Sequence, residues 1–140
     1  MIRLRSDVER KRLAGLDALA RSGGEIGEGL YSTQAGERTY RHLAHLSAAL
    51  LDAGWPVIVD AACLERGQRD LFRDLAHRSG AEFRILEMQS DPAVLRERIA
   101  SRAAQGGDAS DADLRVLQHQ LETAQPLDED EMDCVVAVRE

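Results

Sequence analysis

A single carboxylate, Asp60, follows a short apolar run and is the first candidate for chemistry. Val57, Ile58 and Val59 are β-branched, which is typical of a strand buried on both faces of a sheet. In open α/β sheets, ligands bind beyond the carboxyl ends of the strands. Asp60 is therefore expected either to hold a magnesium ion through water or to cap the loop that follows.

Two pairs of basic side chains also have spacings that suit a site. His42 and His45 lie three residues apart on an expected helix, where they either bind a metal ion or lie on the solvated surface. Arg98 and Arg102 lie four residues apart and so project from one side of another helix, where pairing with nearby acids is the plainer interpretation.

Two further arginines, Arg66 and Arg69, open the helix that follows Asp60. They are candidates to contact a substrate or a phosphate group. The alternative for both is pairing with Asp70 or Asp74 on the helix surface.

A glycine-rich stretch at residues 22–29 is predicted to be a loop, because it holds four glycines and little apolar content. It does not fit the phosphate-binding pattern G-x-x-x-x-G-K-[ST], since Leu30 follows Gly29 where that pattern needs lysine. Lys11 is the only lysine of the chain. The sequence therefore contains no recognisable phosphate-binding loop.

Composition indicates one globular domain spanning residues 1–140, since 44% of the residues are hydrophobic and 31% are charged. The net charge of −7 disfavours nucleic acid and anionic membranes as partners. Cys63 and Cys134 are far apart and are expected to be free thiols in a reducing compartment. No signal peptide or membrane-length apolar run is evident, so the cytoplasm is the expected location.

Helices and apolar strands alternate along the second half of the chain, which predicts an α/β fold with a mostly parallel sheet flanked by helices on both faces. Ser6 and Glu9 have the spacing of a capping box, and Ser32 or Thr33 is expected to cap the longest helix. The expected strands are 2–5, 57–60, 83–88 and 134–138, and the expected helices are 6–13, 33–53, 66–79, one from Pro92, and one ending near 123.

Several segments, taken in order, resemble the P-loop small-molecule kinases. The closest resemblance is to the predicted-kinase, ATP-binding domain that also occurs fused to aminoglycoside-phosphotransferase-like domains. The resemblance rests on these segments: Arg5-Ser6-Asp7-Val8-Glu9-Arg10-Lys11-Arg12-Leu13, Val57-Ile58-Val59-Asp60-Ala61, Arg66-Gly67-Gln68-Arg69, Leu95-Arg96-Glu97-Arg98, residues 107–113, and Leu117-Gln118-His119-Gln120-Leu121.

The resemblance implies roles for individual residues. Asp60 falls on the acid associated with magnesium and the attacking hydroxyl, and Asp7 falls on the acid that faces the phosphate acceptor, with Arg5 beside it. Arg98 and Arg102 fall in a lid at about residues 98–113, where arginines neutralise the transferred phosphoryl group. The family implies ATP and Mg²⁺ as cofactors and a small-molecule hydroxyl as acceptor.

In the family a first strand and a lysine-bearing phosphate loop precede the segment that begins here at Arg5. Two hypotheses follow. In the first, the domain transfers phosphate from ATP as part of an intact parent protein, while these 140 residues alone are inactive. In the second, the chain is a non-catalytic α/β module for binding or dimerisation.

The order of strands in related kinases is 2-3-1-4-5, which places the absent first strand between residues 57–60 and 83–88. The expected outcome is direct pairing of these two strands, with filling of the gap by a second copy as the next choice, and the chain as part of a larger protein as the third. A homodimer through the exposed sheet edge is the corresponding partner prediction.

Overall fold

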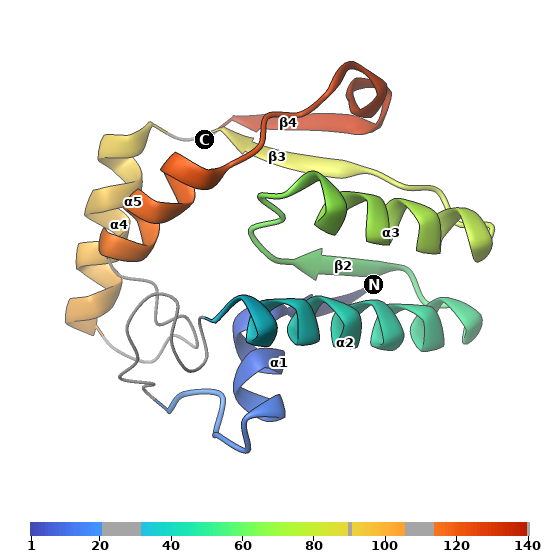
Figure 1. The fold of residues 1–140 in the computed structure, drawn as a ribbon, viewed down its shortest axis with the longest axis horizontal. Coiled ribbons are helices and arrows are strands. Elements are labelled where there is room, and N and C mark those ends of the chain that lie inside the picture. The colour runs from blue at the N-terminus through green and yellow to red at the C-terminus, as the bar shows by residue number, and fades with distance from the viewer. Residues whose placement is uncertain (21–31, 90, 106–113, 140) are drawn as a thin grey trace. The chain divides into compact units, whose positions relative to one another are not determined.

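The computed structural model describes residues 1–20, 32–89, 91–105 and 114–139. Helices and parallel strands alternate, so the predicted α/β fold class is confirmed (Figure 1). The elements are β1 (Ile2–Arg5), α1 (Ser6–Leu13), α2 (Thr33–Asp52), β2 (Val57–Asp60), α3 (Arg66–Arg78), β3 (Ile85–Gln89), α4 (Pro92–Gln105), α5 (Leu114–Thr123), a 3₁₀ helix (Glu129–Cys134) and β4 (Val135–Arg139).

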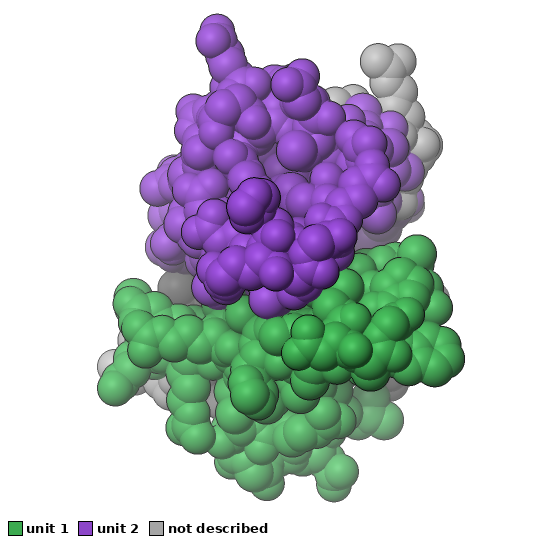
Figure 2. Space-filling view, turned by 90° about the vertical axis from the view of Figure 1, so that its right-hand side faces the viewer, with its two compact units in different colours: residues 1–62, 107–111 green, residues 63–106, 112–140 purple. Residues whose placement is uncertain are grey.

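The described residues form two compact units (Figure 2). The first unit comprises residues 1–20 and 32–62, and the second comprises the described residues from 63 onward. No helix within the described ranges is long and apolar enough to cross a membrane. The predicted glycine-rich loop at 22–29 and most of the predicted lid tip lie outside the described residues.

In the first unit, β1 and β2 run parallel, and α2 packs along them (Figure 1). The register pairs Ile2 with Val57 and Arg5 with Asp60. The Ser32 hydroxyl caps α2 as predicted, since it accepts a hydrogen bond from the Ala35 amide. Leu43 of α2 is completely buried and forms the centre of the core.

The predicted capping box of Ser6 and Glu9 is wrong, although the helix it was expected to start is present. The N-cap of α1 is Arg5, and Ser6 is already the first helical residue. The strand runs directly into the helix, so no residue between them is left to cap it. Glu9 is instead buried and bonded to other side chains.

In the second unit, β3 and β4 run parallel (Figure 1). The N-cap of α4 is provided by Asp91, whose carboxylate accepts a hydrogen bond from the Ala93 amide. Gly80 has a φ of 63°, a left-handed conformation that suits the residue after a helix end and favours glycine. The buried apolar side chains of this unit come from α3, α4 and α5: Phe72, Leu75, Ala76, Ile99 and Leu117.

The prediction that β2 pairs directly with the following strand is wrong for the part of the chain that the structure describes. The ladders there join β1 to β2 and β3 to β4. The residues of β2 are half-buried where full burial was expected, and Leu86, Met88 and Val136 are exposed. Filling of a gap by a second copy stays a prediction.

Candidate functional site

Asp60 lies at the carboxyl end of β2 in a cluster with two arginines of β1. The parallel register places Arg5 directly opposite Asp60, and Arg3, two residues earlier, projects from the same face of the strand. The Arg3 guanidinium donates two hydrogen bonds to Asp60 Oδ2, the one from Nε being 3.0 Å long. Arg5 Nε lies 3.7 Å from the same oxygen. We call Arg3, Arg5 and Asp60 the strand-end cluster.

The strand-end cluster is accessible and carries a net positive charge. The Asp60 side chain is 42% exposed and faces two guanidiniums, so the three side chains sum to one positive charge. A divalent cation that approaches Asp60, directly or through water, meets both guanidiniums and is repelled. An anionic group is attracted by the same charges. The cluster therefore suits a phosphate-bearing ligand better than a magnesium ion.

The other predicted acid of this unit, Asp7, lies in the first turn of α1. Its Oδ1 is 3.4 Å from Nη1 of Arg10, one helical turn on. Both predicted acids are therefore paired with arginine. Within the described ranges, no group of three or more His, Cys, Asp or Glu side chains is placed to hold a metal ion.

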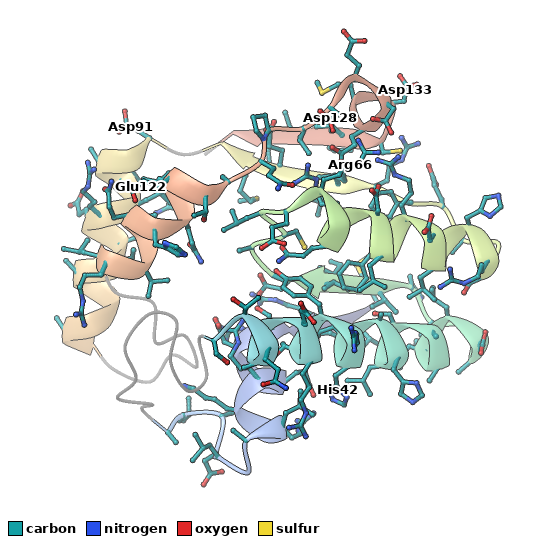
Figure 3. All side chains as sticks on the ribbon, in the orientation of Figure 1. His42, Arg66, Asp91, Glu122, Asp128 and Asp133 are labelled. Atoms are coloured by element: carbon teal, nitrogen blue, oxygen red, sulfur yellow. The ribbon has the colours of Figure 1, made fainter. Side chains whose placement is uncertain are left out.

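His42 is bonded inside the first unit, contrary to the prediction of a solvated surface position. Its Nε2 lies 3.1 Å from Glu9 Oε2, and its side chain is 27% exposed. Glu9 also accepts a hydrogen bond of 2.6 Å from Arg12 Nη1. The bond from His42 joins α2 to α1 (Figure 3). His45 is exposed, as the surface interpretation predicts.

Arg66, at the start of α3, binds three carboxylates of the second unit (Figure 3). Its Nε is 2.9 Å from Asp70 Oδ2, which confirms the alternative of pairing with Asp70. Its two terminal nitrogens donate hydrogen bonds of 2.7 Å, one to Asp128 and one to Asp130. The hydrogen bond to Asp130, followed by those to Asp70 and Asp128, raises the pKa of Arg66 above its ordinary value.

Arg69 is buried, so the prediction that it pairs with Asp70 or Asp74 on the surface is wrong. Its side chain is 5% exposed and binds Glu131, which is completely buried. The two hydrogen bonds measure 2.6 Å to Oε1 and 3.0 Å to Oε2. The hydrogen bonds from Arg69 are the main cause that lowers the pKa of Glu131 to about 2. Asp130 is affected in the same direction, since hydrogen bonds from Arg66 and Arg73 hold its pKa well below the usual range.

The predicted lid arginines belong to α4. Arg98 is exposed on this helix. Arg102 is also a residue of α4, but its side chain lies outside what the structure describes, as do the residues 106–113 expected to complete the lid.

Sequence reasoning missed three residues of these clusters: Arg3, Glu9 and Glu131. The first strand alternates apolar and basic residues, and this alternation was the available signal for Arg3. It places Arg3 and Arg5 on the same face of β1, and the register places Arg5 opposite Asp60 at the end of β2. Glu131 lay inside an acidic run whose other members, such as Glu129, are exposed. No local signal separates it from them.

Comparison with known families places the chain. A family model described as AAA domain matches residues 1–127, which is most of the chain. The chain therefore belongs to this family, whose domains are of the P-loop NTPase type and use nucleotide and Mg²⁺ in general. No curated protein matches the chain.

Proposed function

We propose that this domain serves a kinase-type reaction, in which ATP gives a phosphoryl group to the hydroxyl of a small molecule. The strand-end cluster is the main observation in support, because it puts an accessible carboxylate and two guanidiniums at the carboxyl end of a parallel strand. The AAA family match supports the nucleotide part of the proposal. The 140 residues contain no lysine-bearing phosphate loop, so the proposal includes a longer protein that supplies one.

The proposal gives each group of the first unit a role. Asp60 accepts the hydrogen bond of the acceptor hydroxyl and takes its proton as the hydroxyl oxygen bonds to the γ-phosphorus of ATP, while the bond from that phosphorus to the departing ADP breaks. Arg3 and Arg5 hold the carboxylate in place and attract the phosphate groups. Asp7 contacts the acceptor from the first turn of α1. Asp60 is a single carboxylate, and the described residues contain no group of three or more His, Cys, Asp or Glu side chains that could hold a metal ion, so no step is assigned to magnesium.

The arginines of α4 are proposed to act on the charge of the transferred group. If Arg98 and Arg102 stabilise the transition state, replacement of Arg102 by alanine lowers the rate more than the affinity for ATP. Equal losses in rate and affinity point to plain nucleotide binding.

A non-catalytic module is the second candidate function, and the missing phosphate loop is the observation that favours it. Under this proposal the two-stranded ladders recruit a second copy through an open edge. Light scattering of the 140-residue chain tests this: a dimer supports the module, and a monomer at high concentration removes the dimerisation version.

Calorimetry with ATP and magnesium separates the two candidates. The 140-residue chain is expected to bind ATP no better than millimolar, and a longer version with a phosphate loop is expected to bind it and transfer phosphate. A longer version that binds no ATP contradicts the kinase proposal. Sub-millimolar binding by the 140-residue chain contradicts the need for that loop.

A further inference from the structure

The guanidinium of Arg69 joins two connections of the second unit that are far apart in sequence. One is the end of the β2–α3 loop, at Cys63 and Leu64, and the other is the segment after α5, at Gln125 and Pro126. Arg69 Nη1 donates to the carbonyls of Cys63, Leu64 and Gln125, and each of these hydrogen bonds is 3.2 Å long. Its Nη2 donates a hydrogen bond of 3.1 Å to the Pro126 carbonyl.

The capacity of Arg69 for hydrogen bonding is fully used. A guanidinium has five N–H donors, and here they face four main-chain carbonyls and the two oxygens of Glu131. The side chain is also 5% exposed. A substrate or phosphate group therefore meets neither a free donor nor an open path to Arg69.

Two more hydrogen bonds join the same connections directly. The main-chain N–H of Gln125 donates a hydrogen bond of 2.8 Å to the Leu64 carbonyl. The side-chain oxygen of Gln125 accepts a hydrogen bond of 2.6 Å from the main-chain N–H of Arg66, at the start of α3. Glu131 in turn accepts a bond of 2.9 Å from the Asp128 amide. We call Cys63, Leu64, Arg69, Gln125, Pro126 and Glu131 the arginine junction.

One residue of the arginine junction has a costly backbone conformation. Cys63 has a φ of 47°, which is uncommon for a residue with a side chain, and its carbonyl accepts a hydrogen bond from Arg69. The surrounding bonds must hold such a conformation in place. A lysine at position 69 has three donors from one atom and does not reproduce the planar fork.

We propose that Arg69 is a positioning residue. Its planar guanidinium fixes the main-chain conformation of the β2–α3 loop relative to the segment that follows α5. Glu131 supplies the counter-charge. This assignment removes Arg69 from the set of ligand-binding arginines. It does not depend on the proposed kinase reaction, because it concerns the folded chain alone.

Hydrogen exchange on the 140-residue chain tests the proposal, with the Gln125 amide as the local reporter. In Arg69→Ala, the protection of this amide is expected to fall by about tenfold or more, while the Leu43 amide in the first unit stays within about twofold. Arg78→Ala, which changes an exposed arginine at the end of the same helix, is the control and is expected to leave both amides within about twofold.

Chemical rescue separates positioning from a general contribution to stability. Methylguanidinium at millimolar concentration is expected to restore the protection of the Gln125 amide in Arg69→Ala, and methylammonium is expected not to. Restoration by both cations, or by neither, overturns the role of the planar fork. Unchanged protection in Arg69→Ala overturns the proposal as a whole.

A second variant of the same pair keeps the test decisive if Arg69→Ala unfolds the second unit. Glu131→Gln retains the shape and the acceptor oxygen but removes the counter-charge, so protection of the Gln125 amide is expected to fall more than that of the Phe72 amide in α3. Equal loss at both amides means that the pair stabilises the whole unit without positioning the loop, and this result also overturns the proposal.

Discussion

The strand-end cluster and the arginine junction both combine arginine with a carboxylate, yet they differ in every property that decides a role. At the strand end the side chains of Arg3 and Asp60 are exposed and that of Arg5 is half-buried, and the charges of the three side chains sum to plus one. At the junction Arg69 and Glu131 are buried, matched in charge and bonded at every donor. An exposed carboxylate leaves room for a ligand, whereas a buried arginine whose donors are all bonded serves the structure alone.

The largest expected effect on stability is at Glu131. Glu131→Gln leaves the buried Arg69 cation without its counter-charge and is expected to lower the free energy of unfolding by about 2 to 4 kcal/mol. Glu129→Gln, an exposed neighbour in the same 3₁₀ helix, is the control and is expected to cost about 0.5 kcal/mol or less. Urea titration of both variants measures the difference. A small loss in Glu131→Gln would show that the junction contributes as little as an exposed pair.

The same pair gives a dependence on pH with a definite sign. The folded-state pKa of Glu131 is lowered to about 2 from its ordinary value of 4.5, so its contribution is complete above 4.5 and is lost as pH falls towards 2. The difference in stability between wild type and Glu131→Gln is therefore expected to narrow between these two values. Urea titrations at a series of pH values measure it, and a constant difference contradicts the assignment.

An intermediate effect is expected at His42, which joins α2 to α1. His42→Ala removes one of the hydrogen bonds to the buried Glu9 carboxylate and is expected to cost about 1 to 2 kcal/mol. His45→Ala, one helical turn away and exposed, is expected to stay within about 0.5 kcal/mol of wild type. Equal effects of the two substitutions would show that the hydrogen bond from His42 to Glu9 contributes no more to stability than a solvated surface histidine does.

The smallest effect is expected at Cys63. Glycine tolerates the left-handed conformation that Cys63 adopts, so Cys63→Gly relieves strain in the folded state while it adds freedom to the unfolded chain. These two terms oppose each other, and the net change is expected to lie within about 1 kcal/mol. Cys63→Val, with a β-branched side chain at the same φ, is expected to destabilise more. Thermal unfolding of the two variants compares them.

The fold was predictable where the signal was local. The apolar run before Asp60, the capping serine of α2 and Gly80 at the end of α3 each act within a few residues, and each was placed correctly. The capping box at Ser6 failed because β1 leads into α1 without a turn. The capping pattern of Ser6 and Glu9 does not show that the strand before it continues directly into the helix.

The two clusters were less predictable because they depend on long-range geometry. Arg69 and Glu131 lie 62 positions apart, and Arg3 and Asp60 lie 57 apart. The sequence contains 25 acidic residues as possible partners for each arginine and 18 basic residues as possible partners for each carboxylate. Strand register selects Arg3 for Asp60, and burial selects Glu131 for Arg69, and both arise only once the chain is folded.

Turnover of Asp60→Asn in a longer version that carries a phosphate-binding loop tests the central claim most directly. The exposed strand-end cluster is expected to contribute about 1 kcal/mol or less to stability, so the unfolding midpoint changes little. Phosphoryl transfer from ATP is expected to fall by about a hundredfold or more, because the carboxylate that takes the proton is gone. Asp52→Asn, at the exposed end of α2 in the same unit, is the control and is expected to retain turnover. Unchanged turnover in Asp60→Asn would contradict the account and leave Asp60 as the structural partner of Arg3.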